Sequence, residues 1–199
     1  MLYRRRVFLA EFADMGYLFE PEKLQEIVKP AVGQPFDQMV DTVISGLAAA
    51  YPGYVETKKN FFFSLAGGIT GMINVIHGSF TEYIILFGTP IGSEGYSGRY
   101  SIDIYDIVLS GEMYTYIEPH PGRRVEHPLG EIAYLPKGTA KAVSLARDTW
   151  MLEYGRGPVP TCLLMGLSDA ITAYDYHIIG KTVYTYGRQV LGNLFKGKF

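Results

Sequence analysis

The chain of 199 residues has one cysteine, one tryptophan and few charged side chains. Because Cys162 stands alone, no internal disulfide can form, and a structural zinc site built on several thiolates is excluded. Charged residues make up 19% of the sequence, against about a quarter in ordinary soluble domains. Hydrophobic residues make up 48%. This shortage of polar surface favours a deep pocket, an oligomer interface or a surface that faces a membrane.

Long apolar runs and an excess of one charge are also missing. No stretch reaches the ~18 apolar residues that a membrane span requires, so we expect no transmembrane segment in this chain. The apolar residues 7–10, after the basic residues 4–6, form too short a run for a signal peptide. Lysine and arginine number 18 and aspartate and glutamate 20, which gives no electrostatic reason to expect nucleic acid as a partner.

The sequence does contain many aromatic residues and a three-part pattern. With 16 Tyr and 11 Phe, aromatic-rich strands or a ring-lined cavity are expected. We interpret residues 1–199 as one α+β domain. Residues 1–78 read as a helical N-terminal part, residues 79–157 as a β-barrel and residues 158–199 as a pair of C-terminal helices.

Helical spacing of apolar residues marks both ends of the chain. Pro21 suits a first helical turn, and Pro30 ends that helix. The next helix has one apolar face, formed by Phe36, Met39, Val40, Val43, Ile44 and Leu47. Near the C-terminus the same spacing joins Leu163, Leu164, Leu167, Ala170 and Ile171, and then Ile179, Val183, Tyr186, Val190, Leu194 and Phe195.

The C-terminal helix has two interpretations. Its apolar face, followed by Lys196 and Lys198, is compatible with a helix that lies in a membrane interface. The alternative is that this helix pair packs on the barrel or on a partner subunit.

The middle of the chain has the pattern of an antiparallel sandwich or barrel. Short runs rich in Tyr, Ile, Val and Phe are separated by Gly and Pro. We expect strands over residues 80–87, 99–109, 112–117, 131–135, 139–145 and 149–154.

Two acidic residues lie within these apolar strands. Successive side chains of a strand point to opposite faces, so Asp106 shares a face with apolar residues only, and Glu153 has large apolar neighbours on both sides of its strand. An isolated buried carboxylate is very costly. If the two acids face one cavity, they can share a proton, giving a neutral donor and a carboxylate near pH 7. The alternative is that each acid pairs with a separate partner, such as Arg99 or Arg156.

Several segments resemble the family of sterol Δ8–Δ7 isomerases and the sigma-1 receptor. Residues 77–89 read HGSFTEYIILFGT, residues 92–100 read GSEGYSGRY, and residues 149–157 read TWMLEYGRG. Gly67 and Gly71 match glycines of the family's helix before the first strand. These matches keep their order from about residue 17 to the C-terminus. Tyr96 departs from the family, which usually has histidine there, and Ile69 and Leu145 replace tryptophans of the sigma-1 receptor.

The resemblance implies a cupin-like antiparallel β-barrel, flanked by the N-terminal helices and closed by C-terminal helices that lie at a membrane surface. It implies a sterol or a cationic amphiphilic amine as ligand, no cofactor, no metal, a homotrimer, and the endoplasmic reticulum if the source is eukaryotic. Glu153 and Asp106 match the family's acid pair, and Tyr83 matches the tyrosine that orients it. The implied pocket walls are Ile69, Ile73, Ile85, Phe87, Ile104, Val143, Leu145 and Tyr186.

Two functions from different classes fit this site. As a sterol isomerase, a neutral carboxyl would protonate the alkene at C9, and a carboxylate would remove a proton from C7. As a non-enzymatic receptor of the sigma-1 type, the same pocket would bind lipids or cationic amphiphilic amines, and a protonated amine imitates the cation of that reaction. The sequence does not assign donor and acceptor. A third hypothesis is a scaffold whose helices form a homo-oligomer.

Other candidate groups have simpler interpretations. His77 could relay protons, but a hydrogen-bonded histidine at a helix end is the favoured interpretation. His120, His127 and Glu131 suggest a cupin metal site, but the His-x-His pair is missing and the surrounding prolines predict a loop. Arg99 and Arg156 are expected to be structural, and Cys162 to be a small buried hydrophobe.

Overall fold

The computed structural model describes residues 16–198, and these residues form an α+β fold. The basic residues 4–6 and the apolar residues 7–10 lie outside the described residues. The helices are α2 (Pro21–Val28), α3 (Phe36–Ala50), α4 (Leu163–Gly166), α5 (Ser168–Thr172) and α6 (Tyr176–Leu194), with short 3-10 turns at Lys29–Ala31 and Val159–Cys162. The strands are β1 (Phe62–Ala66), β2 (Ile69–Gly78), β3 (Glu82–Thr89), β4 (Ser93–Tyr96), β5 (Asp103–Ser110), β6 (Met113–Ile117), β7 (Val125–His127), β8 (Ile132–Leu135), β9 (Lys141–Leu145) and β10 (Thr149–Arg156).

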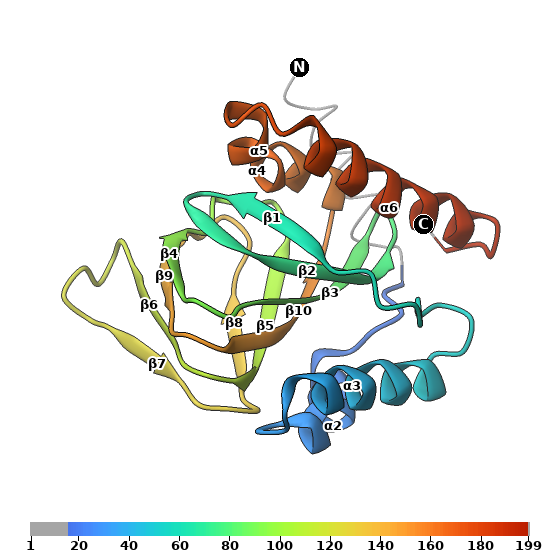
Figure 1. The fold of residues 1–199 in the computed structure, drawn as a ribbon, viewed down its shortest axis with the longest axis horizontal. Coiled ribbons are helices and arrows are strands. Elements are labelled where there is room, and N and C mark those ends of the chain that lie inside the picture. Colours follow the sequence, from blue (N-terminus) through green and yellow to red (C-terminus); the bar gives the residue numbers. More distant parts are fainter. Residues whose placement is uncertain (1–15, 199) are drawn as a thin grey trace.

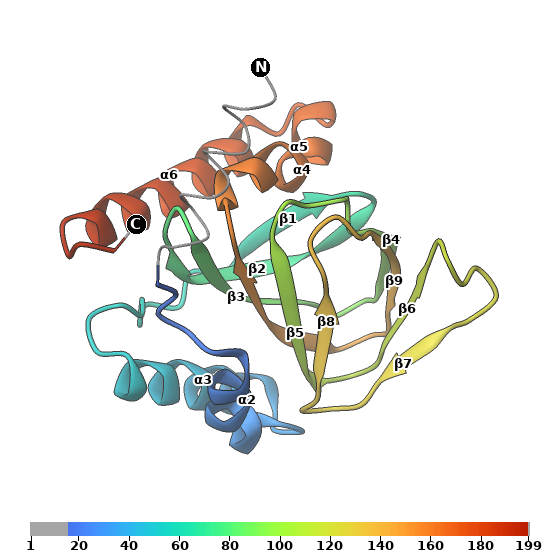
Figure 2. The ribbon, with the colours of Figure 1, turned by 180° about the vertical axis from the view of Figure 1, so that it is seen from behind.

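The strands form two antiparallel sheets. The larger sheet has the order β1-β2-β3-β10-β5-β8, and the smaller one has the order β4-β9-β6-β7. The expected α+β class with antiparallel strands is confirmed, but the sheets are not closed into the expected barrel, because the hydrogen-bonded ladders end at the edges of two separate sheets. Figure 1 shows α2 and α3 below the large sheet and α4, α5 and α6 above β1 and β2. From behind, the β6–β7 hairpin projects from the side opposite α6 (Figure 2).

The large sheet is buried on both faces. One face packs on α2 and α3, and Ile84, Leu86, Ile107 and Leu152 are fully buried there together with residues from both helices. The opposite face of the same strands carries Ile85, Val108 and Met151, among others. Strand alternation therefore divides each strand between a solid core and a second apolar region that faces the small sheet.

The N-terminal part is not helical throughout, which corrects the expectation for residues 1–78. Strands β1 and β2 form a hairpin, and its two-residue turn is Gly67-Gly68, with φ of 63° and 83°. Left-handed backbone at both positions is the geometry that glycine permits in such turns. Gly67 is also held close to β4, since its carbonyl accepts a hydrogen bond from the amide of Tyr96 at 2.8 Å. Gly67 and Gly71 thus lie in a hairpin, not in a helix.

A buried acid connects the two ends of the described chain. Glu82 is fully buried and accepts hydrogen bonds from the amides of Leu18 and Phe19 and from the hydroxyl of Tyr154. Lys198 forms an ion pair with it at 2.6 Å. The cluster fixes the chain after α6 against β3, and it lies apart from the cavity described below.

Candidate active site

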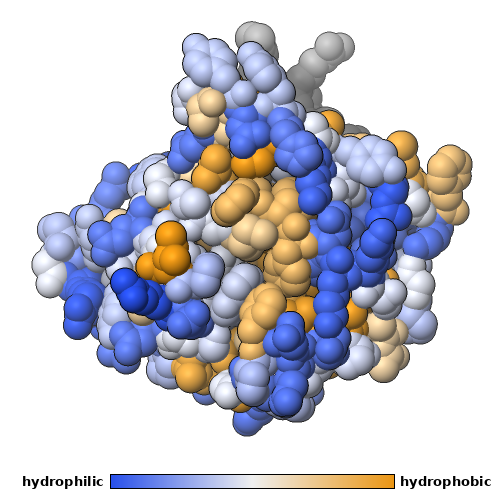
Figure 3. Space-filling model, in the orientation of Figure 1, coloured by the Kyte–Doolittle hydropathy of each residue, from blue (hydrophilic) through white to orange (hydrophobic). Residues whose placement is uncertain are grey.

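One cavity lies between the two sheets and beneath the C-terminal helices. Its volume is about 220 Å³, more than ten times the roughly 15 Å³ that one water molecule needs by the same measure. Most of its lining is apolar and comes from β2, β3, β5, β9 and β10, together with residues of α4 and α6. Figure 3 shows apolar side chains among the polar ones on the face that carries β1 and the C-terminal helices. The space suits an organic molecule.

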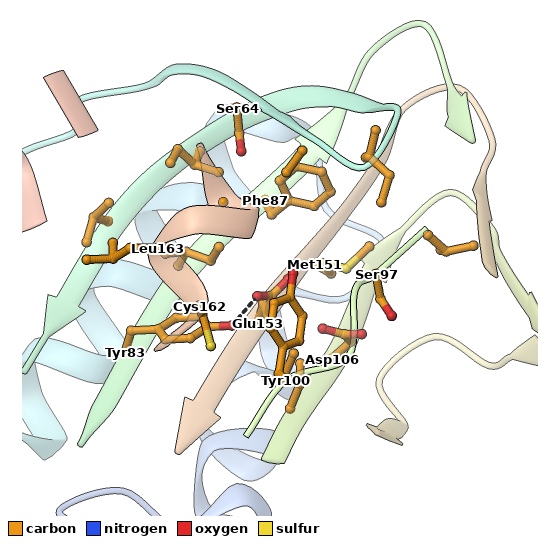
Figure 4. A pocket seen from close by; sticks show the side chains of 18 of the residues that line it. Ser64, Tyr83, Phe87, Ser97, Tyr100, Asp106, Met151, Glu153, Cys162 and Leu163 are labelled. Carbon is orange, nitrogen blue, oxygen red and sulfur yellow. Dashed lines mark hydrogen bonds between the residues drawn. The ribbon is translucent and has the colours of Figure 1, made fainter. Parts of the chain in front are cut away.

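All of the wall residues implied by the family resemblance line this cavity. They are Ile69, Ile73, Ile85, Phe87, Ile104, Val143, Leu145 and Tyr186, and they are joined by Tyr83, Asp106 and Glu153. Figure 4 shows the side chains of Tyr83, Phe87, Asp106 and Glu153 gathered in one region. The structure therefore brings these residues together, and their role in binding stays a prediction.

Asp106 and Glu153 are direct cross-strand neighbours. They form a register pair in the antiparallel ladder between β5 and β10, and residues opposite one another in such a ladder have Cβ atoms roughly 5 Å apart. Both line the cavity. Alternation along each strand predicted the face of each acid, whereas their pairing depends on the register of two strands that are distant in sequence.

Glu153 is held by Tyr83 and has a strongly perturbed pKa. The hydroxyl of Tyr83 donates a hydrogen bond to Oε1 of Glu153 at 2.5 Å. Burial, together with the negative charge of Asp106, raises the pKa of Glu153 to about 7, although Tyr83 and Lys141 act in the opposite direction. A carboxyl with this pKa exchanges its proton near neutral pH, which general acid catalysis requires.

Asp106 has a counter-ion that we did not predict. The ammonium of Lys141 forms an ion pair with Oδ2 of Asp106. Oδ1 of Asp106 is buried and has no hydrogen-bond partner among the described residues. Lys141, Val143 and Leu145 share a face of β9. Alternation from the two predicted wall residues could therefore have placed Lys141 in the cavity.

The arginines considered as partners of the acids lie elsewhere. Arg99 pairs with Glu118 at 2.6 Å, and Arg156 lies 3.9 Å from Glu20. The suggestion that either arginine neutralises Asp106 or Glu153 is wrong, because neither contacts the pair. These ion-pair contacts give both arginines the structural role that we expected.

Tyr100 and Cys162 also line the cavity and were not predicted as pocket residues. Figure 4 shows both side chains beside Glu153. Burial raises the pKa of Tyr100, and the charge of Glu153 raises it further. Burial also raises the pKa of the Cys162 thiol to about 11, so this thiol is a poor nucleophile at neutral pH. Cys162 lies outside regular strands, where alternation gives no signal. Tyr100 belongs to the expected strand 99–109 and has the same alternation as Ile104 and Asp106, so alternation could have placed it in the cavity.

His77 lies outside the cavity. It is a fully buried residue of β2, not of a helix end, and its Nδ1 donates a hydrogen bond to the carbonyl of Tyr54 at 2.8 Å. Its ring packs edge-on against Phe19, and burial lowers its pKa to about 4. Because it lies in the core and does not line the cavity, the structure gives no contact through which it could relay protons to the acids.

No metal centre is evident in the part of the chain that is described. Over residues 16–198, no group of three or more His, Cys, Asp or Glu side chains is arranged to hold a metal ion. His127 instead hydrogen-bonds to Thr115 at 2.8 Å, through Nε2. The expected loop around these residues includes a short strand, β7.

The C-terminal segment covers the cavity and has an apolar outer surface. Helix α5 packs on β1 and α6 on β2. Large apolar side chains are exposed along this segment, namely Leu164, Ile171, Tyr174, Tyr176, Val183, Tyr184, Leu191 and Phe195. Lys198 points inward and pairs with the buried Glu82, whereas Lys196 is exposed and hydrogen-bonds to the carbonyl of Gly53. Within residues 16–198, no helix is both long enough and apolar enough to cross a membrane.

The fold and cavity define an α+β protein with two antiparallel sheets around an apolar pocket that contains a carboxyl pair. The family model described as "ERG2 and Sigma1 receptor like protein" matches residues 2–198. This chain belongs to that family.

Curated relatives cover nearly the whole chain. The C-8 sterol isomerase of Pyricularia oryzae is 34% identical over 97% of this chain and 90% of the relative. The protein erg2 homolog of Dictyostelium discoideum is 36% identical over 86% of this chain and 73% of the relative. The sigma non-opioid intracellular receptor 1 of Xenopus tropicalis is 33% identical over 88% of this chain and 80% of the relative.

Similar solved structures include proteins with cupin in their names. An rmlc-like cupin from Shewanella frigidimarina has a TM-score of 0.40 and 14% identity over 51% of this chain and 85% of that chain. A predicted oxalate decarboxylase from Thermotoga maritima has a TM-score of 0.43 and 13% identity over 52% of this chain and 97% of that chain.

Proposed function

We propose that this chain is a sterol isomerase that moves a ring double bond from Δ8 to Δ7. The observation that carries the proposal is the pairing of Asp106 with Glu153 inside an apolar cavity, where burial raises the pKa of Glu153 to about 7. Curated relatives named as C-8 sterol isomerases support this choice, at 34% identity in one case.

The shift of the double bond requires one proton donor and one proton acceptor within the same pocket. A protonated carboxyl transfers its proton to C9, and the electron pair of the double bond forms the new C9–H bond. The resulting cation at C8 is stabilised by the remaining negative charge and by nearby ring faces. A carboxylate then takes a proton from C7, and the C7–H electron pair forms the C7=C8 bond. No cofactor enters this scheme, because the isomerisation involves no net oxidation.

The exposed apolar residues of α4, α5 and α6 support a peripheral position on a membrane. A sterol dissolves in the bilayer, so a pocket beneath helices that lie on the bilayer would receive its substrate directly. We place this surface at the endoplasmic reticulum if the source is eukaryotic. Assembly into a homo-oligomer, with a trimer as the family precedent, is part of the same proposal.

An amine-binding receptor is the alternative function. Its support is the relative named as a sigma non-opioid intracellular receptor and the carboxyl of Glu153, which Tyr83 orients toward the cavity. A protonated amine beside Glu153 would occupy the place of the C8 cation.

Purified protein supplied with a Δ8 sterol in detergent tests the isomerase. The wild type should form the Δ7 isomer, and Glu153→Gln should reduce the rate by at least about 100-fold, since general acid catalysis contributes roughly 10²–10⁴-fold. The matched control is Glu126→Gln, because Glu126 is exposed on β7. Folded wild type that binds amines tightly but converts no sterol would support the receptor, and full activity in Glu153→Gln would remove that residue from the mechanism.

A further inference from the structure

Lys141 brings a positive charge from the small sheet to the acid pair of the large sheet. It begins β9, and its side chain is only 11% exposed where it meets Asp106. Both of its backbone groups are fixed by Ser97, because its amide donates to Oγ of Ser97 at 2.9 Å and its carbonyl accepts from the Ser97 amide at 2.9 Å. This anchoring fixes the backbone of Lys141, and the ion pair with Asp106 holds its ammonium at the cavity, as a preorganised site requires.

Three other titratable side chains near the acid pair are uncharged near neutral pH. Burial raises the pKa of Tyr83, Tyr100 and Cys162 above their ordinary values, so these groups are neutral between pH 5 and pH 8. On the far side of the ion pair, burial and the charge of Lys141 lower the pKa of His127. Among the described residues, the acidic and basic groups that line the cavity are therefore two carboxyls, Asp106 and Glu153, and one ammonium, Lys141.

We propose that Lys141 is a positioning residue that holds Asp106 as a carboxylate, assigns the transferable proton to Glu153 and limits the affinity of the pocket for cationic amines. Its ammonium neutralises Oδ2 of Asp106, whereas the hydrogen-bond partner of Glu153 within residues 16–198 is a neutral phenol, that of Tyr83. Without this cation the two adjacent acids would share one proton between them. The assignment deepens the proposed function of the same site and rests on it for the roles of donor and base.

The assigned roles give a balanced cycle. Glu153 gives its proton to C9 and becomes a carboxylate. Oδ1 of Asp106, which is buried and unpartnered among the described residues, takes the proton from C7. The proton then returns from Asp106 to Glu153, its cross-strand neighbour, and exchanges with solvent before the next sterol binds, which restores the starting state. The ammonium of Lys141 counters the charge that remains on the acids.

The pocket's response to amines follows from the same charges. With Glu153 protonated, Lys141 and Asp106 cancel, and the cavity has no net charge. A protonated amine must then displace the proton of Glu153 and approach a fixed ammonium. Removal of the ammonium leaves a net negative pocket, in which a cation is strongly favoured at low dielectric.

Infrared difference spectroscopy on the wild type tests which acid carries the proton. One band of a protonated carboxyl should disappear as the pH rises, with a midpoint near 7. The band should be absent in Glu153→Gln and retained in Asp106→Asn. A band that persists in Glu153→Gln would overturn the assignment, and this comparison needs no variant of Lys141.

Replacement of Lys141 tests the role of the ammonium. In Lys141→Met the midpoint of the carboxyl band should rise by at least one pH unit, and the Kd of a cationic amine should fall at least tenfold, with the Kd of an uncharged sterol unchanged. Lys141→Arg should keep both values near those of the wild type. Lys137→Met is the matched control, because Lys137 is exposed on the loop before β9. A folded Lys141→Met with an unchanged midpoint and an unchanged amine Kd would contradict the proposal.

The two proposals fail in different ways. If the infrared and amine results are as expected but no sterol is converted, the isomerase is excluded and the role of Lys141 stands. If sterol is converted but the carboxyl band belongs to Asp106, the isomerase stands and the role of Lys141 is excluded.

Discussion

Tyr83 lies directly opposite Gly155 in the ladder between β3 and β10, and its ring fills the space that a side chain at position 155 would occupy. A Cβ atom on Gly155 would lie 2.2 Å from Cε1 of Tyr83. The same tyrosine donates the hydrogen bond that orients Glu153. Glycine at position 155 therefore leaves room for the Tyr83 ring, and that ring in turn orients the carboxyl of Glu153.

Gly155→Ala tests this relationship. The added methyl should displace the Tyr83 ring and break its hydrogen bond to Glu153, and a bond to a charged group contributes about 1.5–3 kcal/mol. We expect sterol conversion, or amine affinity, to fall roughly 10- to 100-fold. The control is Gly122→Ala, because a Cβ at Gly122 would meet no atom within 4 Å. Equal behaviour of the two variants in the activity assay would show that Tyr83 does not depend on Gly155.

The raised pKa of Glu153 also predicts how the stability of the protein depends on pH. Its pKa is raised from 4.5 to about 7, chiefly by burial, so the folded state binds this proton more tightly than the unfolded chain does. Its contribution to folding is complete below pH 4.5 and is lost as the pH rises through 7. We expect the free energy of unfolding of the wild type, relative to Glu153→Gln, to fall by about 3 kcal/mol between pH 4.5 and pH 8. Urea denaturation of both proteins across this range measures it.

Glu126→Gln controls for unfolded-state effects in that experiment, because Glu126 is exposed. Its stability should follow that of the wild type at every pH. A constant difference between wild type and Glu153→Gln from pH 4.5 to pH 8 would mean that the pKa of Glu153 is not raised by folding.

The exposed apolar surface of α6 predicts binding to lipid vesicles. Leu191 is 59% exposed, and Phe195 at the end of the helix is 92% exposed. Replacing both with serine removes side chains that are each worth roughly 1.5 kcal/mol on burial, so vesicle affinity in a sedimentation assay should fall at least tenfold. Tyr116→Ser is the control, since Tyr116 is also exposed but belongs to β6 on the opposite side of the molecule (Figure 2). A similar loss in both proteins would argue against a specific membrane-facing helix.

The sequence predicted the two C-terminal helical segments and the strands that carry the acids. All six expected strands exist, with β3, β5, β6, β8, β9 and β10 matching them within a few residues. Short runs of β-branched and aromatic residues between Gly and Pro are informative there, even though β5 and β10 are buried on both faces. Alternation of side chains along these runs placed Asp106 and Glu153 on their faces before their pairing was known.

The β1–β2 hairpin was missed for a physical reason. Most of β2 is buried on both faces, so it has no polar–apolar alternation and can be mistaken for a buried helix. The Gly67-Gly68 pair was the available signal, since two adjacent glycines suit a tight hairpin turn. The very short strand β7 gave too few residues for any periodic signal.

Lys141 is a residue whose burial was not predicted from its type. A lysine within a strand is ordinarily assigned to solvent, and this one is buried because it meets a carboxylate that comes from the other sheet. Alternation along β9 could have placed Lys141 on the cavity face, but its contact with Asp106 depends on how two sheets face each other, which local sequence does not encode. The division into two sheets is a similar case, since strand patterns alone do not reveal whether a barrel closes.

The position of solvent hydrogen in the product tests the account most directly. When folded wild-type protein converts a Δ8 sterol in heavy water, the proposed route requires the exchanged proton of Glu153 to enter at C9. Nuclear magnetic resonance of the Δ7 product should therefore show deuterium at C9 and the loss of one hydrogen from C7. A Δ7 product with no deuterium at C9 would contradict proton transfer from a solvent-exchanged carboxyl, and with it the central role given to Glu153.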